Sequence, residues 1–267
     1  MVAGLPDSLG AILAGMPRLA IAYSGGLDSR FLAHASQLAG CEILLLHGQG
    51  PHIPRAETAY AERWAAARGL RIATFQHDAL AIPEVAGNCR MRCYHCKKAL
   101  FGKIIALARA NGFDVVCDGG NRDDLAAYRP GLAAVAELGV KSPLAGLGKA
   151  EIRQLARATG LENCGQLSAA CLLTRFAYDT AIDRAALAQV DACEQKLRQF
   201  LAGAGQGAAE LRLRLDPLHA APVIQIAQAA ASLAPELARI AADCGFPGAS
   251  VLPGPGVSGF FDKSQTQ

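Results

Sequence analysis

Residues 24–29 read Ser-Gly-Gly-Leu-Asp-Ser and combine two glycines, two hydroxyls and one carboxylate. They follow an apolar run, residues 19–23, and precede residues typical of a helix start. The glycines let the backbone approach a ligand closely, and the free N–H groups of the next helix would point at the turn. A phosphate fits there, with Asp28 as a ligand for Mg²⁺. The pattern lacks the Lys-Ser/Thr of a Walker A loop and the Gly-x-Gly-x-x-Gly of dinucleotide-binding folds, so it predicts a different phosphate loop, or else a ligand-free turn.

A second polar loop, residues 118–124, follows another apolar run and reads Asp-Gly-Gly-Asn-Arg-Asp-Asp. Its carboxylates and amide could hold Mg²⁺ or the ribose and phosphates of a nucleotide. By itself the loop is weak evidence, because Asp, Gly and Asn are ordinary turn residues. Ligands of parallel sheets bind at the carboxyl ends of the strands, so we expect both loops to share one site.

Three of the nine cysteines, Cys89, Cys93 and Cys96, have C-x3-C-x2-C spacing. Three such thiols can bind three irons of a 4Fe–4S cluster or part of a zinc site, and the basic residues around them should lower their pKa values. The spacing also matches radical-SAM enzymes, but there the triplet follows the first strand of a barrel. Three unbound thiols before a helix are the plain alternative.

Two further features lie in the last hundred residues. Cys171 stands in a small-residue turn with Arg175 four positions on, so its thiolate could be a nucleophile, although an inert buried thiol fits equally well. Arg212 and Arg214 alternate with leucines, which places both on one face of a strand. They could bind an anionic substrate or form a solvated basic face.

The elements that must position these residues alternate between strand and helix in the first part of the chain. The pattern predicts strands at 19–23, 42–47, 71–76 and 113–118 and helices at 28–39, 55–69 and 94–111. Such alternation indicates right-handed βαβ units around a parallel sheet. Later the order becomes helix 181–203, strands 211–215 and 222–226, helix 229–244 and strand 249–252. We expect an α/β domain over residues 1–178 and a smaller α+β domain over residues 179–267.

Composition narrows the class of protein. The 267 residues are 52% hydrophobic, which is enough for a substantial core. A net charge of +3 argues against non-specific binding of long nucleic acid. No apolar run approaches the roughly 20 residues of a membrane span, and the first residues lack the basic start of a signal peptide. We therefore expect a cytoplasmic protein that acts on a small molecule.

Taken in order, the motifs resemble the ATP-dependent sacrificial sulfur transferases (the LarE family) of the PP-loop ATP pyrophosphatase superfamily. The resemblance covers about residues 18–255 and is carried by residues 24–29, 92–97, 118–124, 128–131, 142–144, 149–153 and 171–175, together with Arg212 and Arg214. It implies a PP-loop domain, similar to the adenine nucleotide alpha hydrolases, that splits ATP into AMP and pyrophosphate.

The implied activity is a step in making the nickel-pincer nucleotide cofactor of lactate racemase. Family members adenylate a carboxylate of pyridinium biscarboxylic acid mononucleotide and convert it to a thiocarboxylate. The resemblance also implies that this protein forms a homo-oligomer. By this resemblance the ATP site comprises Ser24, Gly25, Gly26, Asp28, Ser29, Gly119 and Asn121. Arg129, Arg212 and Arg214 would bind the nucleotide substrate, and Asp28 and Asp124 would hold Mg²⁺.

Two branches of the family obtain sulfur differently. In one branch the enzyme's own cysteine gives up its sulfur and remains as dehydroalanine, a role that Cys171 would take, with Arg175 beside it. In the other branch three cysteines hold a 4Fe–4S cluster that carries an extra sulfide. Cys93, Cys96 and Cys171 match that set, with Cys89 as an alternative ligand, and the pair Cys93 and Cys96 favours the cluster.

The chain departs from the family pattern at two places. The run Val223-Ile224-Gln225 stands where the family usually has Arg-Ile-Glu, and Gly256-Val257-Ser258-Gly259 stands where it often has Tyr-Arg-Ser-Gly. These changes leave the acceptor carboxylate open. An enzyme that thiolates a different acceptor, such as tRNA, is the alternative, although the second domain lacks the aromatic, basic surface of an RNA module.

Overall fold

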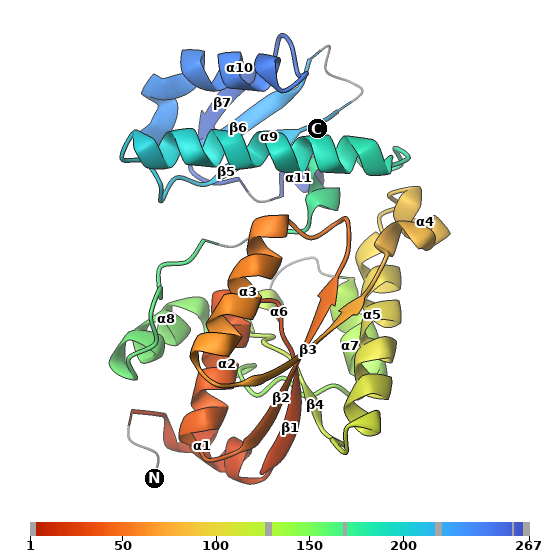
Figure 1. The fold of residues 1–267 in the computed structure, drawn as a ribbon, viewed down its shortest axis with the longest axis vertical. Helices are drawn as coiled ribbons and strands as arrows, with labels where there is room; N and C mark the ends of the chain where they lie inside the picture. Colours follow the sequence, from red (N-terminus) through yellow and green to blue (C-terminus); the bar gives the residue numbers. More distant parts are fainter. Residues whose placement is uncertain (1–3, 126–129, 168–169, 217–220, 258, 264–267) are drawn as a thin grey trace. The chain divides into compact units, whose positions relative to one another are not determined.

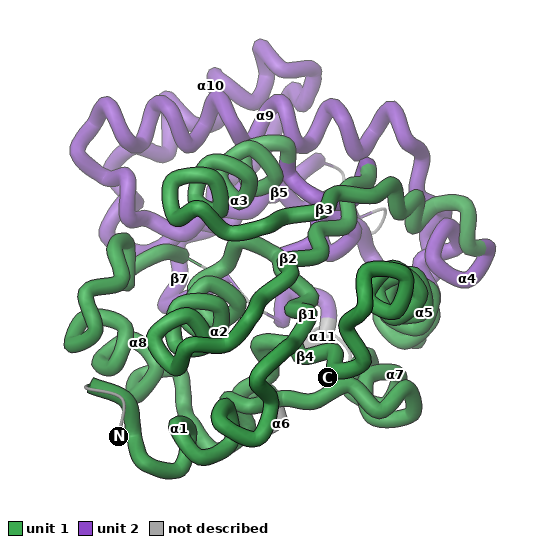
Figure 2. Tube along the Cα trace, turned by 60° about the horizontal axis from the view of Figure 1, so that its bottom comes forward, with its two compact units in different colours: residues 1–50, 55–82, 91–169 green, residues 51–54, 83–90, 170–267 purple. Residues whose placement is uncertain are grey.

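The computed structural model describes residues 4–125, 130–167, 170–216, 221–257 and 259–263 (Figure 1). The chain divides into two compact units (Figure 2). Unit 1 comprises residues 1–50, 55–82 and 91–169, and unit 2 comprises residues 51–54, 83–90 and 170–267. The expected boundary near residue 178 remains a prediction about independently folding domains.

Unit 1 contains a four-stranded sheet in the order β3-β2-β1-β4, and every pair of neighbours is parallel. The strands are β1 (Arg18–Ala22), β2 (Glu42–Gln49), β3 (Arg71–Gln76) and β4 (Val116–Cys117). Buried runs such as Leu19–Ile21 are what a parallel sheet requires, because helices cover both of its faces. The predicted α/β class is confirmed.

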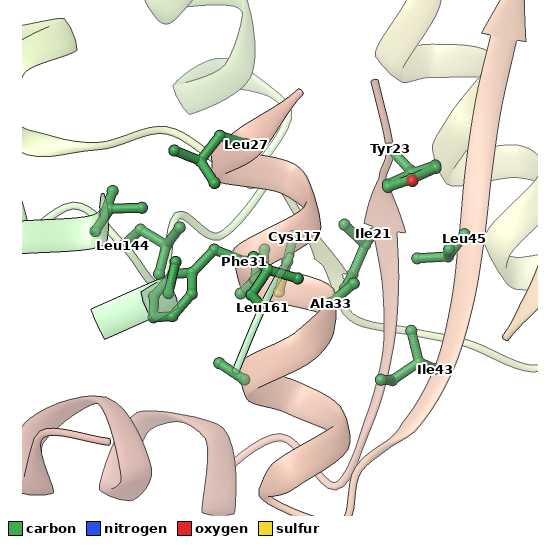
Figure 3. Close-up of a cluster of buried hydrophobic side chains, with 14 of the residues drawn as sticks. Ile21, Tyr23, Leu27, Phe31, Ala33, Ile43, Leu45, Cys117, Leu144 and Leu161 are labelled. Atoms are coloured by element: carbon green, nitrogen blue, oxygen red, sulfur yellow. The ribbon is translucent and has the colours of Figure 1, made fainter. Parts of the chain in front are cut away.

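Successive residues of β1 and β2 enter different cores, as the period of two in a strand dictates. Ile21 and Leu45 join the core that includes Phe31 (Figure 3). Ala20 and Leu44 join the core on the other face of the sheet. The helices of unit 1 are α1 (Asp7–Ala14), α2 (Leu27–Leu38), α3 (Arg55–Ala67), α5 (Arg92–Ala110), α6 (Arg122–Leu125), α7 (Gly131–Glu137) and α8 (Lys149–Ala158), with the 3₁₀ helix η1 (Ala79–Ala81).

Unit 2 contains a three-stranded sheet in which β5 and β6 are antiparallel and β6 and β7 are parallel. Its strands are β5 (Leu211–Arg214), β6 (Val223–Ala227) and β7 (Ser250–Gly254). Its helices are α4 (Pro83–Ala86), α9 (Arg184–Gly203), α10 (Ala234–Asp243) and α11 (Phe260–Lys263), with the 3₁₀ helices η2 (Leu172–Arg175) and η3 (Gln228–Leu233). The predicted order of a long helix, two strands, a helix and a strand is confirmed.

Two expected elements, a strand and a helix, are shorter in the structure than predicted. The strand expected over residues 113–118 is reduced to β4, and at its expected start the Phe113 N–H donates instead to the Ala108 carbonyl of α5 over 2.9 Å. The helix expected from residue 229 begins as η3 and becomes α10 only at Ala234, next to Pro235, a residue favoured in a first helical turn. Within the described part of the chain, no helix is both long and apolar enough to cross a bilayer.

Candidate active site

The glycine turn of unit 1 joins the end of β1 to the start of α2 and is tightly packed. Gly25 has a φ of +80°, a conformation that side chains disfavour. A Cβ added to Gly25 would lie 2.7 Å from the Cβ of Ala61 on α3. Glycine is therefore required at position 25 both by the backbone conformation and by the neighbouring helix.

The two serines close the turn on itself. The Ser24 and Ser29 hydroxyls lie 3.2 Å apart, and the Gly26 N–H donates to Ser24 Oγ over 3.3 Å. Ser29 Oγ donates to the Gly26 carbonyl over 3.0 Å. Gly26 is extended and caps α2, so the first N–H groups of this 12-residue helix point into the turn. This is the geometry of an anion site.

The second polar loop packs against this turn, as expected from parallel-sheet topology. Asn121 Nδ2 donates to Asp28 Oδ2 over 2.9 Å. A Cβ added to Gly119 would lie 2.9 Å from the Ser29 amide nitrogen, so this loop touches the first turn of α2. The structure thus brings together four of the residues predicted to bind ATP, although they lie about ninety positions apart.

The carboxylates of Asp28, which is half-buried, and Asp124, which is buried, lie at this junction. Burial raises the pKa of Asp28, and the charge of Asp124 raises it further, while Lys149 opposes the shift. Asp124 is buried, and its Oδ1 lies 3.8 Å from Lys149 Nζ. Oxygen ligands of this kind suit Mg²⁺, which would relieve the repulsion between the two carboxylates. The residues present therefore fit the predicted metal.

The remaining polar residues of the second loop hold its shape. Asp118 Oδ1 accepts from Ser142 Oγ over 2.6 Å and from the Gly120 N–H over 3.0 Å. The Lys149 N–H at the start of α8 donates to Asp123 Oδ2 over 2.9 Å. Asp118 and Asp123 thus hold the loop to Ser142 and to the start of α8.

Hydrogen bonds from Arg30 and Gln166 support the glycine turn, and the sequence analysis did not identify them. Arg30, fully buried in α2, donates to Gln166 Oε1 over 3.1 Å from Nε and 2.7 Å from NH2. Gln166 Nε2 donates in turn to the Gly25 carbonyl over 3.3 Å. Arg30 follows the motif directly, yet Gln166 lies too far along the chain for any local pattern to indicate it.

Two of the predicted cluster ligands lie in the first turns of α5. Cys93 is exposed and Cys96 is half-buried, and a separation of three residues places them on one side of the helix. The Cys96 sulfur lies 3.4 Å from Nε2 of His77, a buried residue that sequence reasoning did not identify. None of the nine cysteines, all of which lie in the described ranges, forms a disulfide.

The other two candidate thiols, Cys89 and Cys171, belong to unit 2, whereas Cys93 and Cys96 belong to unit 1. The ligand set Cys93, Cys96 and Cys171 therefore remains a prediction. Cys171 immediately precedes η2, and its carbonyl accepts a hydrogen bond of 3.3 Å from Arg175 NH1. Arg175 is buried and forms a bidentate ion pair of 2.8 Å with Glu194 on α9.

Arg212 and Arg214 on β5 are both buried, which excludes a solvated basic face. Arg212 NH1 donates to the Val257 carbonyl over 3.1 Å, and burial lowers the pKa of Arg212 to about 10. Arg214 donates to Gln225 Oε1 over 3.2 Å from Nε and 2.9 Å from NH2. Arg129, the third predicted substrate ligand, lies outside the described residues.

The two departures from the family pattern meet at this arginine pair. Gln225 holds Arg214 through its amide oxygen, and its Nε2 donates to the Gly256 carbonyl over 3.0 Å. The Val257 carbonyl accepts from both Arg212 and Arg214. The neutral amide of Gln225 and the apolar side chain of Val257 thus stand where the family pattern has an acidic and a basic side chain.

Comparison with known proteins places these features in a family, although no protein-family model matches the chain. An uncharacterized protein of Synechocystis sp. is 35% identical over 197 residues, covering 73% of this chain and 74% of that protein. An uncharacterized protein of Methanocaldococcus jannaschii is 31% identical, covering 70% of this chain and 72% of that protein.

A third relative has an assigned activity. The pyridinium-3,5-bisthiocarboxylic acid mononucleotide synthase of Lactiplantibacillus plantarum is 30% identical over 197 residues, covering 72% of this chain and 71% of the synthase. With the α/β fold of unit 1, this extent of similarity shows that the chain belongs to the family of that synthase, the LarE family.

Proposed function

We propose that this protein is an ATP-dependent sulfur transferase that converts a carboxylate of pyridinium biscarboxylic acid mononucleotide to a thiocarboxylate. The observation that carries the proposal is the junction of the two polar loops, where Asn121 holds Asp28 beside the glycine turn. Similarity to the synthase of L. plantarum supports the choice of substrate.

The first step of this proposal is adenylation. A carboxylate oxygen of the substrate attacks the α-phosphorus of ATP, and the bond to the β-phosphate breaks with release of pyrophosphate. The N–H groups at the start of α2 and the hydroxyls of Ser24 and Ser29 bind the departing pyrophosphate. Asp28 and Asp124 would hold Mg²⁺, which supplies positive charge to the phosphates.

The second step transfers sulfur. In the sacrificial version the Cys171 thiolate attacks the acyl carbon and AMP leaves with its electron pair. Loss of the Cys171 α-proton then breaks the Cβ–S bond, which leaves the thiocarboxylate on the substrate and dehydroalanine in the chain. In the cluster version Cys93, Cys96 and Cys171 would be thiolate ligands of a 4Fe–4S group that supplies sulfide.

Arg212 and Arg214 are proposed to bind the phosphate of the substrate. Both are buried on one strand, and a buried guanidinium is best stabilised by an anion that it can hydrogen-bond. Arg129 is proposed as a further ligand on the basis of the family pattern alone. We also propose that the protein works in the cytoplasm and that it forms a homo-oligomer. Sedimentation measurements can test the oligomeric state.

The products formed from ATP test adenylation. The wild type should release AMP and pyrophosphate, and Asp28→Asn should lose this activity because a neutral amide binds Mg²⁺ more weakly than a carboxylate does. The matched control is Asp114→Asn, which removes an exposed carboxylate from the same unit. Release of ADP by the wild type would contradict the assignment of the loop.

The fate of the sulfur separates the two versions of the second step. If the protein is sacrificial, the wild type should become lighter by one H₂S after a single turnover, and Cys171→Ser should stay unchanged in mass. If a cluster supplies sulfur, Cys93→Ser and Cys96→Ser should each lose most of the iron bound after anaerobic reconstitution. Cys41→Ser, a change at a half-buried thiol of unit 1, serves as the control. Repeated turnover with sulfide and no bound iron would contradict both versions.

A further inference from the structure

Glu194 is a fully buried acidic residue in the middle of α9. Charged side chains are rarely buried unless they are paired. Its two carboxylate oxygens accept hydrogen bonds of 2.8 Å from Nε and NH2 of Arg175, which is the bidentate geometry of a strong ion pair. Burial acts to raise the pKa of Glu194, but the hydrogen bonds and charge of Arg175 outweigh it and hold the pKa below its usual range.

Glu194 is also anchored to its own surroundings. Its Oε1 accepts a hydrogen bond of 2.8 Å from the Leu213 N–H on β5. Its Oε2 accepts a hydrogen bond of 2.6 Å from Arg198, one helical turn away. The carboxylate is therefore fixed by contacts with both α9 and β5. Its two oxygens, which accept hydrogen bonds from Arg175, thus have a defined orientation.

The opposite edge of the Arg175 guanidinium faces the backbone around Cys171. NH1 donates to the Ala170 carbonyl over 3.0 Å and to the Cys171 carbonyl over 3.3 Å. NH1 also lies 2.9 Å from Thr174 Oγ1, which itself donates to the Cys171 carbonyl over 2.9 Å. Arg175 thus joins the fixed carboxylate of Glu194 to the peptide groups on either side of the Cys171 Cα.

We infer that Glu194 is a positioning residue which, through Arg175, fixes the backbone of Cys171 so that its thiol is presented for sulfur transfer. This inference rests on the proposed function of Cys171, and it holds whether that thiol donates sulfur or ligates a cluster. Arg175 then acts on Cys171 through hydrogen bonds to the backbone. A displacement of about 1 Å at a reacting group can cost about a hundredfold in rate, so the loss of this support should be measurable.

The test compares Glu194→Gln with Arg198→Gln in the full-length protein. Glu194→Gln keeps the shape of the side chain but loses the charge that orients Arg175, whereas Arg198→Gln removes the other cation from the same carboxylate without touching the Cys171 backbone. We expect Glu194→Gln to slow sulfur transfer in a single turnover at least about tenfold. The KM for ATP and the rate of pyrophosphate release should stay near wild type.

The rate at which iodoacetamide alkylates Cys171, followed by peptide mass spectrometry, is the second measurement. Glu194→Gln should change this rate, because it frees the peptide groups around Cys171, and Arg198→Gln should not. Alkylation needs no substrate, so it reports on the support of Cys171 even if the wild type makes no pyrophosphate and the proposed function fails. Equal alkylation rates in the wild type and Glu194→Gln would overturn the inference.

Thr174→Val keeps the test decisive if Glu194→Gln does not fold. It removes the hydroxyl that joins Arg175 to the Cys171 carbonyl and leaves the ion pair with Glu194 intact. We expect the same changes in alkylation and transfer as in Glu194→Gln, but smaller. Wild-type values for both measurements in Thr174→Val would count against positioning through the backbone.

Discussion

Gly25 is the residue whose identity the structure restricts most tightly in the candidate site. Its φ of +80° is one obstacle to substitution, and the Ala61 side chain, 2.7 Å from where a Cβ would lie, is another. We predict that Gly25→Ala lowers the free energy of unfolding by about 1–2 kcal/mol through backbone strain and about 1–3 kcal/mol through crowding. ATP binding should weaken with it. Urea denaturation and equilibrium binding of ATP provide the measurements.

Gly40 offers the control that separates those two effects. It has a φ of +76°, but a Cβ added there meets nothing within 4 Å. Gly40→Ala should therefore show the backbone strain alone. Measured against Ala61→Gly alone, Gly25→Ala should cost less than it does in the wild type, although the Ala61 Cα still lies 3.1 Å from the added Cβ. If Gly40→Ala lowers the free energy of unfolding as much as Gly25→Ala does, the contact with Ala61 contributes nothing to the loss.

Arg212 and Arg214 differ in how far the protein itself uses their donors. Arg214 donates to Gln225, Val257 and the Thr174 carbonyl, so its replacement leaves several buried acceptors without their donor. We predict that Arg212→Gln raises the KM of the nucleotide substrate about tenfold or more, the value of a hydrogen bond to a charged group, and leaves the KM of ATP unchanged. Equal changes in both KM values would contradict a role in substrate binding. Arg214→Gln should raise the same KM and in addition lower stability, measured by urea denaturation.

At the scale of elements, Glu194 connects α9, β5 and η2, and this connection should depend on pH. The folded pKa of Glu194 lies below the unfolded value of about 4.3, so the folded state binds fewer protons in that range. Its contribution to stability is complete above about pH 4.3 and is lost as the pH falls through the folded pKa. We predict that the wild type loses stability below about pH 4.3 more steeply than Glu194→Gln.

Near neutral pH the same variant should be less stable by about 3–5 kcal/mol, because Arg175 keeps its charge in a buried place without its counter-ion. Urea denaturation at several pH values, followed by circular dichroism, measures both effects. Parallel pH profiles for the wild type and Glu194→Gln would show that another carboxylate is responsible.

The elements themselves show which features could be predicted from the sequence. The buried runs of β1 and β2 and the polar loops after β1 and β4 stand out because their patterns are local. The sequence did not indicate that Gln166 supports Gly25, that His77 contacts Cys96 or that Glu194 pairs with Arg175. Each of those contacts joins two elements, so neither residue carries a local signal. The predicted strand before Asp118 is longer than β4, because the Phe113 N–H bonds to the Ala108 carbonyl of α5, a contact between elements that the strand pattern does not show.

At the scale of the whole molecule, the segment before α9 belongs with the sheet of unit 2. The Leu215 N–H donates to the Arg175 carbonyl over 2.6 Å, and the Ala177 N–H donates to the Leu215 carbonyl over 3.1 Å. We predict that a fragment of residues 170–267 is better folded than a fragment of residues 179–267, which lacks Arg175. Circular dichroism and thermal denaturation of both fragments make the comparison. If the two fragments show the same circular dichroism and the same thermal denaturation, residues 170–178 contribute nothing to the stability of unit 2.

The chain passes between its two units five times, at residues 50, 54, 82, 90 and 169. All of unit 1 is therefore translated before most of unit 2. At about 5–20 residues per second, the segments 51–54 and 83–90 are translated at least about 4–16 s before residue 170 is made. During that interval β1 to β4 can already pair, and the two segments must stay out of the growing sheet. Pro51, Pro54 and Pro83 lack the N–H groups that such pairing needs, so the nascent chain is protected from recruiting these segments into the wrong unit.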